Sequence, residues 1–191
     1  MAASPQARVT PEEYLERDRA AEFRSEYYAG RIYPMSGGTW THATLIHNLT
    51  VSLTGATRGK KCAVRSSDMR VRISANFYGY PDVLVICDEP RFEDARTDVV
   101  ENPILIVEVL SPSTEAYDRG FKASHYRRMP SLRELVLVSR DEPRIEIFRR
   151  QPSDEWLLSE SIGLDSTCRF ESLPCSIPMS EIYDSVTFDP A

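Results

Sequence analysis

Residues 102–126, with the sequence NPILIVEVLSPSTEAYDRGFKASHY, decide the fold. The run Ile104–Leu110 is short and apolar, which is typical of a central strand buried on both faces. After a turn of sequence SPST, residues 114–129 predict a helix that stops before Pro130. A buried strand followed closely by a helix indicates a mixed sheet with helices packed on it, in the α/β or α+β class.

The elements on either side support this class. Near the amino end, the sequence TPEE forms a capping box, so a helix is expected over about 10–23. An Ala-Gly pair at 29–30, between aromatic residues, predicts a tight hairpin. Apolar residues every three or four positions predict a second helix over about 41–57. Further strands are expected at Met69–Ile73, Val83–Cys87, Leu135–Val138 and Ile145–Phe148.

Length and composition fit one globular domain. The chain has 191 residues, of which 41% are hydrophobic and 27% charged. We expect a domain over 10–185, a flexible amino terminus over 1–9 and a tail over 186–191. No run of 18 apolar residues exists and the amino terminus lacks an apolar signal segment, so we expect a cytoplasmic protein without membrane contact.

The cysteines predict neither a zinc site nor a disulfide. The closest spacing among them is seven residues, which excludes the paired-cysteine pattern of zinc ligands. We therefore expect reduced cytosolic thiols, mostly in the core, at Cys62, Cys87, Cys168 and Cys175.

Two acids lie where acids are rare. Asp82 opens the apolar strand at 83–87, and Glu108 lies inside the apolar run 104–110. A carboxylate in such a strand costs several kcal/mol unless it is paired, hydrogen-bonded or metal-bound. If the two strands are adjacent, the carboxylates converge, and hard oxygen donors of this kind suit Mg²⁺.

A lysine follows on the next helix. Asp118, Lys122 and Tyr126 are spaced by four residues and share one helix face. The short SPST connection could bring Lys122 to the end of the strand that carries Glu108. A cation at that place can activate a water molecule or stabilise charge developing on a phosphate.

Each residue alone also has a simpler interpretation. Asp82 follows a proline and suits the start of a strand, and Glu108 could be a structural acid paired with an arginine. Lys122 could be a solvated helix residue in an ordinary surface ion pair with Asp118. It is the combination of two acids on two strands with a lysine on the following helix that indicates a catalytic site.

At these residues the chain resembles the PD-(D/E)xK superfamily of restriction-endonuclease-like nucleases. It resembles more closely a bacterial branch of restriction-endonuclease-like proteins of uncharacterised function. The resemblance spans about residues 10–185. The matching segments are Glu26–Tyr33, Ser67–Val71, Tyr80–Val83 and Asn102–Tyr126.

The resemblance implies a metal site for Mg²⁺ or Mn²⁺. Asp82 and Glu108 would bind the ion, the backbone carbonyl of Val109 would be a further ligand, and Glu26 would supply an additional acid. The parent E-x-K motif requires a lysine at position 110, but Leu110 stands there.

In this branch the lysine is supplied by the next helix, which implies Lys122. Asp118 and Tyr126 would then support the site or contact the substrate. His42 also matches the branch, at the start of the second helix, where it could instead be a residue that hydrogen-bonds the helix start.

The net charge of −6 disfavours nucleic acid, but the charge is segregated. Residues 58–72 hold six basic residues against one acid, and residues 119–133 hold five against none. Residues 151–191 hold eight acids and one arginine. These arginines could simply pair with acids on the surface. The candidates for phosphate contact are Lys60, Lys61, Arg70, Arg72, Arg127 and Arg128.

The expected function is that of a Mg²⁺-dependent endonuclease that hydrolyses DNA with a metal-activated water molecule, as a homodimer by analogy. One alternative is a catalytically inactive module that kept the nuclease fold for binding. Another is a structural interaction protein, in which Glu108 pairs with a protein cation and binds no metal.

Overall fold

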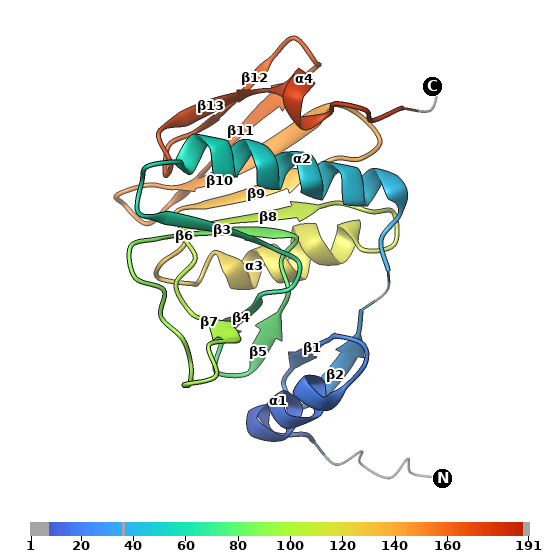
Figure 1. The fold of residues 1–191 in the computed structure, drawn as a ribbon, viewed down its shortest axis with the longest axis vertical. Coiled ribbons are helices and arrows are strands. Elements are labelled where there is room, and N and C mark those ends of the chain that lie inside the picture. The colour runs from blue at the N-terminus through green and yellow to red at the C-terminus, as the bar shows by residue number, and fades with distance from the viewer. Residues whose placement is uncertain (1–7, 36, 189–191) are drawn as a thin grey trace.

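The molecule has a large and a small β-sheet with one helical segment between them, and a separate two-stranded hairpin (Figure 1). The computed structural model describes residues 8–35 and 37–188. The small sheet has the order β2 (Arg31–Pro34), β1 (Ser25–Tyr28), β5 (Phe77–Gly79), β4 (Arg70–Ser74), β7 (Val99–Val100). The large sheet has the order β11 (Trp156–Ile162), β10 (Arg144–Arg150), β9 (Glu134–Val138), β8 (Leu105–Val109), β6 (Val83–Cys87), β3 (Cys62–Ser66).

Both sheets are mixed, as the sequence predicted. β8 and β9 run parallel, as do β4 and β7, and the other strand pairs are antiparallel. The remaining elements are α1 (Pro11–Ala20), α2 (Trp40–Thr57), the π-helical turn η1 (Tyr117–Lys122), α3 (Ala123–Tyr126), α4 (Met179–Ile182) and the hairpin of β12 (Thr167–Phe170) and β13 (Cys175–Pro178).

The hydrophobic core consists of clusters of buried side chains between successive layers of helices and sheets. α2 buries Leu45, Leu49 and Leu53 against one face of the large sheet, and each fully buried leucine contributes about 1.5–3 kcal/mol. The continuous helix of η1 and α3 lies between the opposite face of the large sheet and the small sheet. α1 packs on the outer face of the small sheet through Tyr14 and Tyr27.

Local sequence signals explain the amino-terminal part. The capping box is present, since Thr10 Oγ1 accepts from the Glu13 amide and Glu13 Oε2 accepts from the Thr10 amide. α1 ends three residues before the predicted boundary because the Asp18 carboxylate accepts from the Ser25 amide at 2.8 Å and turns the chain into β1. The predicted hairpin is confirmed.

Arg70 faces the interior, contrary to the prediction that it contacts phosphate. Its side chain is 5% exposed, and its Nη2 atom lies 2.6 Å from Asp18 Oδ2. Tyr80 also donates to Asp18 Oδ2, and Asp98 lies 3.2 Å from Arg70 Nη1. α1 covers Arg70 on this face of β4, so the arginine is part of a buried ion network instead.

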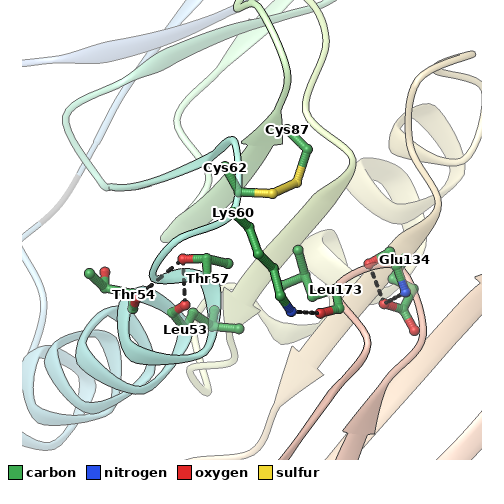
Figure 2. Close-up of a disulfide and its surroundings, with 9 residues drawn as sticks. Leu53, Thr54, Thr57, Lys60, Cys62, Cys87, Glu134 and Leu173 are labelled. Carbon is green, nitrogen blue, oxygen red and sulfur yellow. Dashed lines mark hydrogen bonds between the residues drawn. A yellow bond between two sulfur atoms is a disulfide. The ribbon is translucent and has the colours of Figure 1, made fainter.

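The structure also corrects the prediction for the cysteines. Cys62 and Cys87 form a disulfide (Figure 2), while Cys168 and Cys175 are free. The antiparallel register of β3 and β6 places the two bonded residues directly opposite each other. Because the strand at 62–66 was not predicted, this pairing could not be recognised from the sequence.

The predicted flexible terminus (1–9) and tail (186–191) are only partly described by the structure. Residues 1–7 and 189–191 lie outside the described residues. Val9, however, donates its amide to the Gly30 carbonyl at 3.1 Å, and Phe188 packs 5.6 Å from the Tyr183 ring. The domain bounds stay predictions. Within residues 8–35 and 37–188, no helix has the length and apolar character needed to cross a membrane.

Candidate active site

The strand register brings the two anomalous acids to one place. β6 and β8 are antiparallel neighbours with Val83 opposite Val107, so the next position pairs Asp82 with Glu108. Both side chains follow the alternation of Leu84 and Ile106, which face the helical segment between the sheets. The expectation that these strands are adjacent and in register is therefore confirmed.

Lys122 lies at the centre of this group of acids. Its Nζ atom is 2.8 Å from Glu108 Oε1, 3.1 Å from Glu26 Oε1 and 3.6 Å from Asp118 Oδ1. The side chain is 6% exposed, so it is not the solvated helix residue of the simpler interpretation. The helical segment following β8 thus brings Lys122 beside Glu108, and its role as the lysine of the motif stays a prediction.

Two tyrosines fix the carboxylates from the same helical segment. The Tyr126 hydroxyl donates to Glu108 Oε1 at 2.7 Å, as its predicted place on the helix face allows. The Tyr117 hydroxyl donates to Glu26 Oε2 at 3.1 Å and was not predicted. On an ordinary α-helix, residues five apart point about 140° away from each other. The π-helical turn at η1 is wider, and it brings Tyr117 and Lys122 to the same carboxylate.

Glu26 reaches the site because its neighbouring strand leaves room. It lies on β1, where β5 places Gly79 across from it. A Cβ atom at Gly79 would lie 3.2 Å from Glu26 Oε1 and the same distance from Ile73 Cδ1. A side chain there would crowd the carboxylate. This role of the glycine has no signal in the sequence alone.

His42 adds a titratable group beside Asp82. Its Nε2 atom lies 3.3 Å from Asp82 Oδ2, and that oxygen also accepts from the Val109 amide at 2.7 Å. Thr39 caps α2 by accepting from the His42 amide, so the His42 backbone takes part in the helix start, and its role in the site stays a prediction. Gly38 packs on the ring, because a Cβ atom there would be 2.7 Å from His42 Nδ1.

The site holds more carboxylate than cation. Burial raises the pKa of Glu108 to about 8; Lys122 opposes this rise, and the charges of Asp82 and Asp118 add to it. Burial also raises the pKa of Asp118. Burial alone would lower the pKa of Lys122, but Glu108 and the other anionic groups raise it well above its usual value. The site therefore retains protons because its acids outnumber its bases.

These groups form part of the wall of a cavity of about 650 Å³. The wall is built by the site acids, the end of β2, the start of α2 and the loop before η1. The lining residues outside the acid group include Tyr33, Pro34, Met35, Thr39, His42, Tyr80, Ser111, Thr114, Tyr117, Lys122 and Arg140.

The donor chemistry fits a hard divalent cation. Among residues 8–35 and 37–188, no group of three or more His, Cys, Asp or Glu is arranged to hold a metal ion. The two carboxylates of Asp82 and Glu108 nevertheless line the cavity beside Val109, and oxygen donors of this kind suit Mg²⁺ or Mn²⁺. The surplus of buried negative charge is what a bound cation would offset.

The predicted phosphate contacts do not gather at the cavity. Lys60 donates to the Leu173 carbonyl at 2.6 Å (Figure 2). It follows α2, whose 18 residues span about 27 Å, whereas His42 is at the other end. Arg72 pairs with Glu101 at 3.0 Å. The Arg127 guanidinium covers the Phe148 ring, while Lys61 and Arg128 are exposed and do not line the cavity.

The contact between His42 and Asp82 gives a titration that can be measured. Hydrogen bonding to Asp82 raises the pKa of His42 above 6.5, despite opposing burial. In the metal-free protein, NMR titration of the imidazole should therefore place it above that value, and Asp82→Asn should lower it. Because the folded pKa is raised, the stability gained from this pair is fully present at low pH and is lost as pH rises through the pKa of the folded state.

The variants His42→Gln and His47→Gln assign the resonance in this experiment. Unfolding by urea at several pH values should show that wild-type protein loses its advantage over Asp82→Asn as the pH increases. A His42 pKa at or below 6.5 would contradict the contact.

A mixed sheet with an acid before one central strand, a second acid in the neighbouring strand and a lysine on the following helix defines a restriction-endonuclease-like protein. The sequence profile of the Uma2 family, described as "Putative restriction endonuclease", matches residues 11–179, and the chain belongs to this family.

Two relatives come from Synechocystis sp. (strain ATCC 27184 / PCC 6803 / Kazusa). The uncharacterized protein slr1290 is 34% identical over 187 residues, which is 97% of each chain. The uncharacterized protein sll1609 is 36% identical over 163 residues, covering 85% of this chain and 92% of the relative.

The fold is also that of a crystal structure from Anabaena variabilis ATCC 29413, described as a "putative nuclease belonging to DUF820". The TM-score is 0.75 at 15% identity, with 94% of this chain and 99% of that chain covered, and this likeness is one of fold.

Proposed function

We propose that this protein is a metal-dependent nuclease that hydrolyses DNA phosphodiester bonds. One observation carries the proposal. The carboxylates of Glu26, Asp82, Glu108 and Asp118 line one cavity, and Lys122 is the one lysine among its lining residues. Buried acids in such excess are costly unless a cation joins them. The family to which the chain belongs supports a nuclease, and proteins of this fold usually use a divalent metal.

Asp82 and Glu108, with the carbonyl of Val109, would hold Mg²⁺ or Mn²⁺. When bound, the cation supplies Lewis-acid stabilisation of phosphate charge and a more acidic water. Lys122 has a raised pKa and stays protonated, so it acts as a hydrogen-bond donor to developing charge and not as a base. Tyr126 and Glu26 keep its ammonium and the Glu108 carboxylate in place.

A second candidate is the structural interaction protein, which binds no metal. Lys122 already pairs with three of the four acids, and an ion pair between Glu108 and a protein cation is what a metal-free structural role requires. This candidate predicts no metal binding, so titration calorimetry with Mn²⁺ separates the two. The homodimer and the cytoplasmic location stay predictions.

Hydrolysis of labelled DNA with Mg²⁺ or Mn²⁺ tests the proposal. Wild-type protein should cut and bind the metal. Glu108→Gln should lose about a hundredfold or more in rate, because it removes one charged ligand of the site. The matched control is Glu89→Gln, an exposed acid outside the cavity, which should behave as wild type. Metal binding without hydrolysis would favour the inactive module. Equal rates in the two variants would exclude the proposed role of Glu108.

A further inference from the structure

We propose that the cavity accepts an unpaired DNA strand, with the base next to the scissile phosphate stacked on Tyr33. This inference rests on the nuclease function proposed above and specifies its substrate. It follows from the size of the cavity, from the face on which Tyr33 lies, and from the scarcity of free cations near the acids.

The cavity has the size of a site for one small ligand. Its volume of about 650 Å³ falls within the ~300–1,000 Å³ of pockets that enclose single molecules. Glu108 is 3% exposed and Glu26 is 8% exposed, so a phosphate must enter the cavity to reach them. Duplex DNA is stiff over about 50 nm, whereas a single strand can turn at one nucleotide and insert its phosphate.

The hairpin of β1 and β2 directs Tyr33 toward the same cavity as the acid. Tyr33 is the cross-strand partner of Glu26, so both side chains lie on one face of the hairpin. Tyr33 lines the cavity, remains 41% exposed and is followed by Pro34 and Met35 in the wall. An aromatic ring above a phosphate-binding floor is a platform on which any unpaired base can stack.

A tryptophan stands at the start of α2, beside the same wall. Trp40 follows the lining residue Thr39 and lies two positions before His42. It is 85% exposed, although tryptophan is on average well buried in folded proteins. It does not line the cavity itself, but its place next to Thr39 makes it a fluorescent reporter of strand binding.

The charges around the cavity suit contact with only one or two phosphates of a DNA strand. None of the six predicted phosphate-binding residues lines it, and Arg140 is the lining cation outside the acid group. Its Nη1 atom lies 3.4 Å from Thr39 Oγ1. Duplex binders of the non-specific kind neutralise many phosphates, whereas one or two contacts to a single strand give a salt slope of only about −0.7 to −1.4.

Fluorescence titration with oligothymidylate tests the inference, with Ca²⁺ replacing Mg²⁺ so that binding is observed alone. The variant Trp156→Phe leaves Trp40 as the only tryptophan, since the chain has two. Oligothymidylate should quench its emission, and a duplex of equal length should bind at least tenfold more weakly. Tyr33→Ala should weaken strand binding about tenfold by removing one stacked base, while Tyr33→Phe should preserve it.

The control is Phe23→Ala, which removes an even more exposed aromatic side chain, outside the cavity wall, and should leave affinity unchanged. Duplex binding as tight as strand binding, or equal affinities for Tyr33→Ala and Phe23→Ala, would overturn the inference. Separate hydrolysis assays with Mn²⁺ keep the two proposals apart. Strand binding without any hydrolysis would overturn the nuclease function alone, and hydrolysis of duplex without preference would overturn the strand preference alone.

Discussion

Lys122→Met should lower DNA hydrolysis by at least about a hundredfold and at the same time reduce the free energy of unfolding by about 3–5 kcal/mol. The activity falls because the donor that faces the developing charge is gone. The stability falls because Glu26, Glu108 and Asp118 lose the ammonium that they share, while all three remain buried. Methionine keeps an unbranched apolar side chain in place of the lysine stem, so most of the packing is retained.

Urea unfolding and hydrolysis rates measured on the same preparations check both parts. Adding Mn²⁺ should restore much of the lost stability without restoring the rate, because a cation can replace the charge of Lys122 but not its hydrogen bonds to substrate. Lys61→Met, at an exposed lysine outside the cavity, is the matched control. A Lys122→Met protein as stable and as active as this control would refute the central role of the lysine.

Arg70→Met should cost about 3–5 kcal/mol of unfolding free energy, because it leaves the buried carboxylate of Asp18 without its cationic partner. The side chains of Arg70 and Asp18 are 5% and 1% exposed, so water cannot compensate the charge. The double variant with Asp18→Asn should recover part of the loss, since the orphaned charge is removed with it.

The same variants decide whether Arg70 binds phosphate. Chemical denaturation gives the stability, and the salt dependence of DNA binding gives the number of phosphate contacts. For folded Arg70→Met, the slope should equal that of wild type. Arg65→Met, at an exposed arginine, provides the comparison. Unchanged stability with a reduced slope would return Arg70 to the role that the sequence suggested.

The parts of the site that the sequence predicts are those set by local periodicity. Glu108 is conspicuous because apolar residues surround it, and the spacing of four residues places Asp118, Lys122 and Tyr126 on one face. Two short apolar runs predict the two strands, whereas their adjacency is seen only in the structure. These signals depend on a few neighbouring residues, so a single sequence contains them.

The parts that the sequence does not predict depend on contacts between distant segments or on a departure from ideal geometry. Tyr117 joins the site only through a π-helical turn, and Gly79 matters only because β5 pairs with β1. The bond of Cys62 to Cys87 requires the register of two strands, one of them unrecognised. The role of Arg70 was predicted wrongly because α1, the helix that covers it, is distant from β4 in the sequence.

The two-residue turn of the first hairpin has a consequence for how this family can vary in length. Surface loops usually tolerate inserted residues, but here Ala29 and Gly30, at φ angles of 47° and 90°, join strands that carry Glu26 and Tyr33 on one face. Side chains alternate along a strand, so a slip of one residue would turn one of the two outward. Homologues that add or lose a residue at this turn should therefore fill the proposed roles of Glu26 and Tyr33 by other means. Homologues that use the site in the same way should keep a spacing of seven residues between the acid and the aromatic residue.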